Sequence, residues 1–580
     1  MATTFAPVRP QIMGATHMVS SGHYLASAAG YRILEEGGNA IDAGVAAGIA
    51  INVVKPVATN FGGVAPIIIH LAATNKTVTI SGLGRWPKAA SIDYFESNHG
   101  GDLPEGMLRT VTPAAVDAWM TALELYGTMT FEQVVAPARE LADKGFPVAS
   151  SHANIWQRPA IAELVKNWPS TLSIFMPEGR HLKAGELLAQ KDLARTFERL
   201  SEVERSNAHR GREGAIRAAR DFFYKGDIAD EIVNWCQQEG GLLTKEDMSE
   251  FSVEVEEPVV GSFKEYEIKT CGPWCQGPVV AQTLQMLEND DLAALGHNSP
   301  DYIHTVAEAL NLAFSDREYY YGDPDFVDVP MNEIMSKAYT RARRGLIDPQ
   351  RAFGKLPLKG DPRNARAVLD GSLGDASGTG RTGEEVSDTS YACVVDQWGN
   401  GFSATPSDFA IMSSRVPSLG IVISGSGTSS WMERNHPSSI GPRKRPRLTP
   451  NPAMAFKNGK LLMPFGTPGG DVQAQAMVQT FLNIAEFGMD PQAAVDAPRF
   501  ISWNFPNSFW PHDYLPGKLV FEDGIPTEVI SELARRGHDN SPEGVRAVGN
   551  GDVCAVMLDH DLGILKGAAD HRVESYVIGR

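Results

Sequence analysis

The chain is 580 residues long, enough to bury a large core and, by length alone, to form about two to four domains. Its hydrophobic content of 43% and charged content of 21% are ordinary for a globular protein. The net charge of -18 argues against a nucleic-acid partner, because such a partner needs a basic face. The short basic run at 443–447 is expected to be a solvated loop.

Residues 1–14 lack the charged start and apolar centre of a secretory signal. The longest uninterrupted run of apolar residues and glycine, 43–51, is too short to cross a bilayer. The cysteines are few, odd in number and scattered, which suits a reducing compartment. They are Cys236, Cys271, Cys275, Cys393 and Cys554. We therefore expect a cytoplasmic protein without a membrane partner.

The first half of the chain is predicted to be mainly helical. Residues 21–54 have alanine-rich helical spacing, with a stop at 37–39 and a restart directly after it. Three further segments carry apolar residues at three- and four-residue spacing, at 112–127, 130–145 and 299–322. Strand-like pieces lie between these helices, at 66–73, 77–82 and 265–272.

From residue 391 onward the pattern changes to short strands separated by glycine turns. The predicted strands are 391–396, 401–405, 420–424, 453–456, 461–466, 553–558 and 563–570. No repeat of solenoid length is present. Helices interleaved with sheets, without a parallel βαβ rhythm, favour helices packed outside stacked sheets.

Two motif-like segments are not expected to carry chemistry. The glycine pattern at 378–383 has a loose segment before it and a strand after it, whereas a dinucleotide site needs a strand and then a helix. In the segment CGPWC, 271–275, three residues separate the thiols, so a bend before a helix starting near Val279 is favoured over a redox site. The common metal, ATP and serine-hydrolase motifs are absent from the sequence. No metal or organic cofactor is expected.

The stretch 354–388 has no convincing periodicity and ends directly before Thr389, which opens a predicted strand. A structureless stretch of this length usually has a function or is disordered. A threonine hydroxyl is a poor nucleophile unless a base lies beside it, and the α-amine of an N-terminal threonine can be that base. Such a threonine arises only when the chain is cut before it. The alternative is that a threonine merely suits the start of a strand.

Several segments, weak singly but specific in their order, resemble the gamma-glutamyltransferases and their acylase relatives among the N-terminal-nucleophile (Ntn) hydrolases. They lie at 37–56, 136–148, 226–233, 240–251, 321–330, 465–471 and 496–500. The resemblance covers nearly the whole chain. It implies an α/β fold of four layers, αββα, with helices outside two stacked antiparallel sheets. It also implies an amide hydrolase or acyltransferase.

Carried over position by position, the resemblance implies cleavage of the bond between Asp388 and Thr389. Residues 1–388 would form a large subunit, with 354–388 as a flexible segment before the cleavage point. Residues 389–580 would form a small subunit, and the two would make one composite domain. The implied partners are therefore the protein's own two chains and a small amide, with a homo-oligomer of processed heterodimers also open.

Within the small subunit, Thr389 matches the nucleophile and Ser407 matches a hydroxyl that hydrogen-bonds it. Gly469 and Gly470 match the pair whose backbone N–H groups form an oxyanion hole, since only a residue without a Cβ lets an acyl carbonyl approach so closely. The simpler alternatives are a plain turn for the glycines and an ordinary loop serine for Ser407.

The residues that would read a glutamyl α-amine depart from the family pattern. Phe409 occupies the asparagine position, and a serine pair becomes Leu448-Thr449. Ser426 and Ser429 fall near the expected acceptors, within the segment GIVISGSGTSS. An ammonium facing such groups would lose charge-assisted hydrogen bonds.

Two arginines are candidates to clamp a substrate carboxylate. Arg109 lies near the family's position, one residue out of register with Pro113, and Arg447 is the second candidate. The alternative for Arg109 is a solvated side chain before a helix. We expect an amidohydrolase whose acyl group carries a distal acid but no amine. A genuine gamma-glutamyl enzyme acting on glutathione-like substrates and an unprocessed binding protein are the alternatives.

Overall fold

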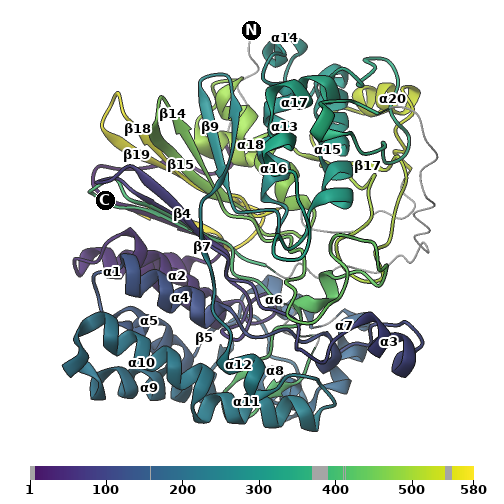
Figure 1. Cartoon of the computed structure of the whole chain (residues 1–580). Helices are drawn as coiled ribbons and strands as arrows, with labels where there is room; N and C mark the ends of the chain where they lie inside the picture. Colours follow the sequence, from purple (N-terminus) through teal and green to yellow (C-terminus); the bar gives the residue numbers. More distant parts are fainter. Residues whose placement is uncertain (1–6, 157, 369–388, 409–410, 412, 542–550) are drawn as a thin grey trace.

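The computed structural model describes residues 7–156, 158–368, 389–408, 411, 413–541 and 551–580. Within them, two seven-stranded antiparallel sheets lie face to face, and helices cover both outer faces (Figure 1). This arrangement confirms the predicted αββα architecture. In this part of the chain, no helix has both the length and the apolar character needed to cross a membrane.

Both sheets contain strands that precede residue 369 and strands that follow residue 388. The first runs in the order β1 (Ile12–Gly14), β19 (Ile564–Ala569), β18 (Cys554–Asp559), β15 (Lys460–Gly466), β14 (Ala453–Lys457), β9 (Tyr266–Thr270), β8 (Val259–Phe263). The second runs in the order β20 (Tyr576–Gly579), β2 (Met18–Ser21), β10 (Ala392–Val395), β11 (Gly401–Ala404), β3 (Ile67–Leu71), β4 (Lys76–Ile80), β7 (Val255–Glu256). Neither sheet could therefore be completed by one half of the chain alone.

The helices form an upper layer on the first sheet and lower layers on the second (Figure 1). The upper layer contains α13 (Gly277–Leu287), α15 (Pro300–Tyr320), α17 (Lys337–Arg344), α18 (Val472–Ala485), α19 (Pro491–Asp496) and α20 (Thr527–Arg535). The second sheet is covered by α1 (Tyr24–Glu35), α2 (Ala40–Val54) and α4 (Ala115–Tyr126). Below them lie α5 (Phe131–Lys144), α9 (Lys191–Ser206), α10 (Gly211–Lys225), α11 (Asp227–Gln238) and α12 (Lys245–Ser249). The long helices predicted at 21–54, 112–127, 130–145 and 299–322 are all present.

Shorter elements connect these layers. The helices are α3 (Ile92–His99), α6 (Ser150–Ile155), α7 (Pro159–Leu164), α8 (Pro169–Phe175), α14 (Leu292–Leu295) and α16 (Met331–Ile334). Small two-stranded ribbons are formed by β5 (Phe146–Pro147) with β6 (Leu187–Leu188), β12 (Arg415–Val416) with β13 (Ile421–Val422), and β16 (Phe500–Ser502) with β17 (Leu519–Phe521). The 3-10 turns η1 (Met107–Arg109) and η6 (Ser426–Ser429) lie at the candidate site.

Helix α2 is buried along its whole length because it lies between the second sheet and α4. Two glycines permit this packing. A Cβ at Gly44 would overlap the ring of Phe402 on β11, and a Cβ at Gly48 would overlap the indole of Trp119 on α4. The glycines and alanines of segment 37–56 are thus explained by close contact on both sides of one helix.

Two expectations about local structure need correction. The strand predicted at 420–424 is reduced to β13, which pairs with β12 outside the two sheets, because Gly420 adopts φ +67 before it and η6 follows it. The described part of the segment 354–388, residues 354–368, is held on the protein. There, Ser315 donates to the carbonyl of Pro357 at 2.6 Å and Tyr320 to that of Gly360 at 2.7 Å.

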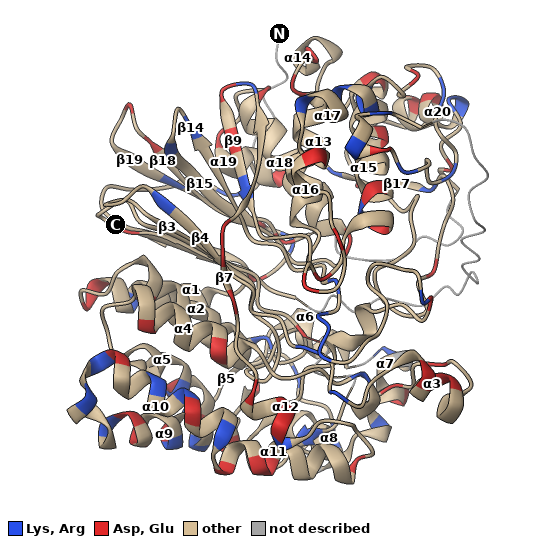
Figure 2. Cartoon of the chain, viewed as in Figure 1, with Lys and Arg blue, Asp and Glu red and all other residues tan. Residues whose placement is uncertain are grey.

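The basic run at 443–447 is not the solvated loop that we expected. Lys444, Arg445 and Arg447 are all at least nine-tenths buried. Arg445 lies 2.8 Å from a carboxylate oxygen of Asp323 and 3.0 Å from one of Glu256. The error arose because the acidic partners are remote in sequence. Charges of both signs elsewhere mix along the outer helices α9, α10 and α11 (Figure 2).

The packing of α2 gives a stability prediction. Gly44→Val should lower the midpoint of thermal unfolding, since the added methyl groups must displace Phe402, and overpacking typically costs about 1–3 kcal/mol. Gly459→Asn is the matched control, because Gly459 has φ +74 with open space around it and asparagine tolerates that conformation. Equal midpoints for the two variants would contradict the packing account of α2.

Candidate active site

Thr389 lies at the mouth of the β10–β11 pair. These strands pair Ala392 with Ala404, and continuing that antiparallel register brings Thr389 opposite Ser407. An isolated bridge joins the two residues, and Oγ1 of Thr389 lies 2.9 Å from Oγ of Ser407. Thr389 is only 1% exposed. Backbone register and a second hydroxyl thus hold the threonine hydroxyl in one place.

The opposite end of this hairpin is fixed by Asp396. Its Oδ1 accepts the N–H groups of Trp398 and Asn400, each at 2.9 Å. Its Oδ2 accepts the N–H of Ala40, the first residue of α2, at 2.9 Å. These hydrogen bonds hold the turn against the buried helix α2. They therefore restrict sliding of β10, the strand that Thr389 precedes.

Gly469 and Gly470 form the turn between β15 and α18, with φ of +119 and +55. These values favour glycine, and a Cβ at Gly470 would also lie 3.2 Å from the ring of Phe509. The carbonyl of Gly469 accepts the N–H of Val472, and that of Gly470 accepts Nε2 of Gln276 at 2.8 Å. Neither glycine N–H finds an acceptor among the described residues. Two N–H groups are thus available to an oxygen of a bound group.

The glycine turn and Thr389 lie at the same end of the stacked sheets. Gly466, the last residue of β15, packs so closely on the ring of Tyr391 that a Cβ there would overlap it. Gly466 precedes the glycine turn, and Tyr391 follows Thr389 on the way into β10. The contact between the sheets therefore brings both segments together.

A buried ion pair strengthens this contact. Nζ of Lys55 lies 3.2 Å from Oδ2 of Asp552, and the N–H of Asp552 donates to Oγ1 of Thr467 at 2.5 Å. The ammonium also lies close to Ser390, because a Cβ built at Gly22 would lie 3.6 Å from Nζ and would overlap the Ser390 hydroxyl. Burial raises the pKa of Asp552 to about 6, while Lys55 acts in the opposite direction. The pair therefore lies beside the base of the glycine turn and near Gly22, against which Ser390 packs.

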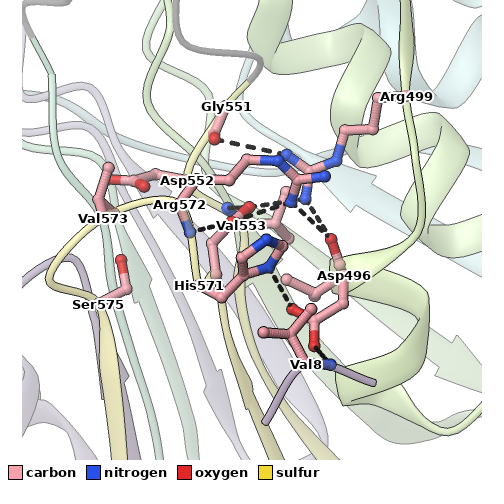
Figure 3. A network of polar contacts seen from close by, with 12 residues as sticks. Val8, Asp496, Arg499, Gly551, Asp552, Val553, His571, Arg572, Val573 and Ser575 are labelled. Carbon is pink, nitrogen blue, oxygen red and sulfur yellow. Dashed lines mark hydrogen bonds and ion pairs between the residues drawn. The ribbon is translucent and has the colours of Figure 1, made fainter. Parts of the chain in front are cut away.

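The segment that carries this aspartate is anchored by Arg499 (Figure 3). The guanidinium donates to the carbonyl of Gly551 at 3.4 Å and to Oδ2 of Asp570 at 2.7 Å. Nearby, Nδ1 of His571 lies 2.9 Å from Oδ1 of Asp496. Segment 496–500 thus holds the chain around Asp552 in place, through Asp496 and Arg499.

A fully buried cation, Arg317 on α15, lies beneath the glycine turn. It forms an ion pair with Asp471, and its Nη1 donates to Oε1 of Gln276 at 2.9 Å. Gln276 in turn donates Nε2 to the carbonyls of Gly470 and Thr449, at 2.8 and 3.0 Å. This network fixes the direction in which the turn presents its free N–H groups.

Arg317 and Gln276 were not predicted from the sequence. The available signal was the run Asp316-Arg317-Glu318 inside a helix with apolar flanks, since consecutive charges on a buried helix must find partners. Nothing in the sequence around Gln276 marks it, because its partners are backbone carbonyls of distant loops.

Arg447 belongs to the same buried network. Its Nη1 donates to the carbonyl of Arg317 at 3.0 Å, and its Nη2 lies 3.0 and 3.1 Å from the two carboxylate oxygens of Glu318. Burial lowers the pKa of Arg447. The Nη2 group is therefore already engaged by a protein carboxylate.

Arg109 lies in η1, directly beside the serine turn η6. The N–H of Val111 donates to the carbonyl of Ser424 at 3.0 Å, and a Cβ at Gly427 would overlap the carbonyl of Arg109. The guanidinium donates Nε and Nη2 to the carbonyl of Leu103, at 3.0 and 2.8 Å. Burial lowers its pKa. Among the described residues, Nη1 of Arg109 has no hydrogen-bond acceptor.

The remaining predicted binding residues are polar and buried. The hydroxyls of Ser429 and Thr449 have no hydrogen-bond partner in the part of the chain that the structure describes. Ser426 begins η6, and the preceding Gly425 donates its N–H to Oδ1 of Asp408 at 2.9 Å. Asp388 and Phe409 lie outside the described residues.

The CGPWC segment is a structural bend, as predicted. Cys271 and Cys275 are buried, unpaired and packed with Trp274 and Leu448. Burial raises the pKa of the Cys271 thiol well above its ordinary value, so the reactive thiolate is suppressed. Helix α13 begins at Gly277, directly after the bend. The glycine pattern at 378–383 lies outside the described residues.

Comparison with known proteins agrees with this arrangement. A family model described as gamma-glutamyltranspeptidase matches residues 26–579. The glutathione hydrolase proenzyme of Bacillus subtilis (strain 168) is 30% identical over 582 residues, covering 98% of this chain and 92% of its own length. The Acylase ACY 1 proenzyme of Pseudomonas sp. (strain V22) is 32% identical over 579 residues, covering 97% and 93%.

The solved structures give the same result. The crystal structure of a cephalosporin acylase from Bacillus halodurans superposes with a TM-score of 0.84 at 26% identity, covering 100% of this chain and 98% of that one. The resemblance stated from the sequence is therefore confirmed. The chain belongs to the gamma-glutamyltranspeptidase family of Ntn hydrolases, which includes glutathione hydrolases and acylases.

Proposed function

We propose that this protein is a self-processing amidohydrolase or acyltransferase whose nucleophile is the hydroxyl of Thr389. The observation that carries the proposal is the buried pair of hydroxyls, Thr389 Oγ1 and Ser407 Oγ, 2.9 Å apart at the strand mouth. The paired free N–H groups of Gly469 and Gly470 at the same end of the sheets support it. Relatives named as proenzymes add support for processing into two chains.

Processing would use the same hydroxyl as turnover. Oγ1 of Thr389 attacks the carbonyl carbon of Asp388, the peptide nitrogen leaves as the new α-amine, and water hydrolyses the ester that results. The products are a large chain ending at Asp388 and a small chain beginning at Thr389. The free α-amine, with an unperturbed pKa of about 7.7–8.0, then acts as the base for the hydroxyl.

Turnover would follow in two stages. The α-amine takes the hydroxyl proton as Oγ1 attacks the substrate amide, and the oxygen that becomes negative accepts the N–H groups of Gly469 and Gly470. The proton passes to the leaving amine, which departs and leaves an acyl ester on Thr389. Water, deprotonated by the same α-amine, or an acceptor amine then releases the acyl group.

The binding groups favour an acyl chain with a distal acid and no α-amine. Among the described residues, Nη1 of Arg109 has no acceptor, and the hydroxyls of Ser429 and Thr449, which have no partner there either, can donate or accept. Arg447 is less suited to the carboxylate clamp, because Glu318 already engages its Nη2.

A gamma-glutamyl substrate is the second candidate. It is favoured by relatives named glutathione hydrolase and by the fully buried carboxylate of Asp408 beside the serine turn. A carboxylate at that place could receive an ammonium.

The nucleophile is tested by Thr389→Ala. This variant should stay a single chain and should have no measurable activity, because one hydroxyl serves both reactions. Ser390→Ala is the matched control: it removes the adjacent buried hydroxyl, which has no described partner, and should still be cleaved. Denaturing gels and N-terminal sequencing of the small chain measure the outcome. An intact wild-type chain that turns over substrate would refute the proposal.

The support of the glycine turn is tested by Gln276→Met, which preserves volume but removes the donor to the carbonyls of Gly470 and Thr449. We expect kcat to fall by about 10- to 100-fold with little change in folding, since loss of a whole oxyanion donor costs about 100- to 1,000-fold. Gln285→Met is the matched control, because Gln285 lies on α13, which begins directly after Gln276, and its hydrogen bonds to Met335 and Ser262 are away from the site. A similar kcat for both variants would exclude this positioning role.

The acyl preference is tested with two chromogenic anilides that differ only in the α-amine, glutaryl and gamma-glutamyl. We expect the glutaryl anilide to have the higher kcat/KM by at least about tenfold, because an unmet ammonium typically loses about 1–3 kcal/mol. A clear advantage for gamma-glutamyl would make the second candidate the substrate class. Thr389→Ala should abolish both activities and serves as the blank.

A further inference from the structure

Away from the active site, three side chains with metal-binding donor atoms gather under the upper helices. His304 and Glu308 are spaced four residues apart on α15, so they share one face of the helix. His538 reaches them from the turn after α20, which packs against α15. One donor atom from each residue lies within 4.8 Å of the other two. The three side chains are 0%, 1% and 6% exposed.

The hydrogen bonds around His304 prepare one ring nitrogen for a ligand role. Nε2 lies 2.8 Å from the carbonyl of Asp348, which can only accept, so Nε2 carries the proton. Nδ1 is therefore a lone-pair nitrogen, and it lies 2.9 Å from Nε2 of His538. A histidine that donates one N–H to a backbone carbonyl and turns the other nitrogen inward is the usual arrangement at protein metal sites.

Glu308 completes the donor set and is itself positioned. Its Oε2 accepts the N–H of Phe353 at 3.2 Å, and its Oε1 lies 3.4 Å from Nδ2 of Asn311 and 3.8 Å from Nδ1 of His538. Among the described residues, no lysine or arginine forms an ion pair with this carboxylate, so a bound cation would offset the cost of burying its charge.

We propose that His304, Glu308 and His538 bind a Zn²⁺ ion that fastens α15 to the C-terminal segment. Imidazole and carboxylate donors suit zinc, whereas Ca²⁺ and Mg²⁺ prefer sites made of oxygen alone. Tetrahedral zinc with bonds of about 2.0–2.2 Å needs donor atoms about 3.3–3.6 Å apart. Nδ1 of His304 and Nε2 of His538 lie 2.9 Å apart, and one donor atom from each of the three residues lies within 4.8 Å of the other two, so side-chain shifts of about an ångström would suffice.

The site would join residues on both sides of the proposed cleavage point. His304 and Glu308 precede residue 388, and His538 follows residue 389. His304 contacts the carbonyl of Asp348, and Glu308 accepts the N–H of Phe353, so the site also lies beside the residues that lead into segment 354–388. A consequence, which rests on the proposed processing, is that zinc would tether the large and small chains after cleavage. Metal binding itself does not depend on cleavage.

No metal was predicted, because the short metal-binding motifs are absent from the sequence. Here two ligands come from the pattern His-x-x-x-Glu on one helix, and the third is more than two hundred positions away in sequence. Only the fold brings them together.

Metal content tests the proposal directly. Full-length protein without a histidine tag should be stripped with a chelator, loaded with zinc, desalted and analysed by mass spectrometry for bound elements. We expect about one zinc ion per chain for the wild type and a background level for Glu308→Gln and His538→Gln. His209→Gln is the matched control, because His209 is an exposed histidine outside the cluster and its loss should leave the zinc content unchanged.

Thermal unfolding provides the second readout and separates metal binding from a structural role. Added zinc should raise the unfolding midpoint of the wild type but not that of Glu308→Gln. Glutamine can still accept the N–H of Phe353, so this variant should fold without metal. A wild type that retains no zinc would overturn the proposal, as would an unchanged zinc content or an unchanged zinc-dependent shift in Glu308→Gln. The active-site chemistry of Thr389 would be unaffected by either result.

Discussion

Strand β10 is hydrogen-bonded on both sides, to β2 and to β11, and its register decides where residue 389 lies. A slip of one residue would turn every side chain of the strand to the other face of the sheet. Thr389 would then no longer face Ser407. The strand is short and wholly buried, so the turn at Asp396 and its bond to the start of α2 determine the register. The position of the Thr389 hydroxyl thus depends on α2, the helix that packs on the outer face of the sheet.

The second constraint is the burial of charge beneath the glycine turn. Arg317, Arg447, Glu318 and Asp471 are all nine-tenths buried or more, and they pair with one another. Breaking one such pair leaves an uncompensated charge in the interior, which typically costs about 3–5 kcal/mol. This network fixes the relative positions of α15 and of the loops that lead into α13 and α18. Catalytic N–H groups need that rigidity, because donors must already point to where negative charge develops.

Much of the fold followed from the sequence because its signals are local. The helical spacing at 299–322 and the glycine turn at 465–471 are visible in short windows. The strand predicted at 420–424 shrank because tertiary packing, and not β-propensity, decides whether a short apolar run joins a sheet. The basic run at 443–447 was misread for a related reason. Its partners, Asp323 and Glu256, lie on distant segments, and no periodicity reveals such a pairing.

In the candidate site, too, some residues could be predicted from local motifs and others could not. Thr389, Ser407 and the two glycines could be named from motif order, whereas Gln276 and Arg317 act through carbonyls and carboxylates that only the fold brings near. Arg447 and Arg109 were equal candidates in the sequence, and the structure distinguishes them by their partners. Arg447 is paired with a buried glutamate, while Nη1 of Arg109 has no acceptor among the described residues. The residues proposed to react are thus marked by local motifs, whereas the residues proposed to position them are not.

The central claim is that Thr389 becomes the N-terminal residue of a small chain and carries the acyl group. The most direct measurement is tandem mass spectrometry of the enzyme, quenched in acid during turnover of a slow amide. We predict that a chain spanning 389–580 gains the mass of the acyl group and that fragmentation places this mass on Thr389. Turnover by an uncut chain of 580 residues, or an acyl group on any other residue, would contradict the account.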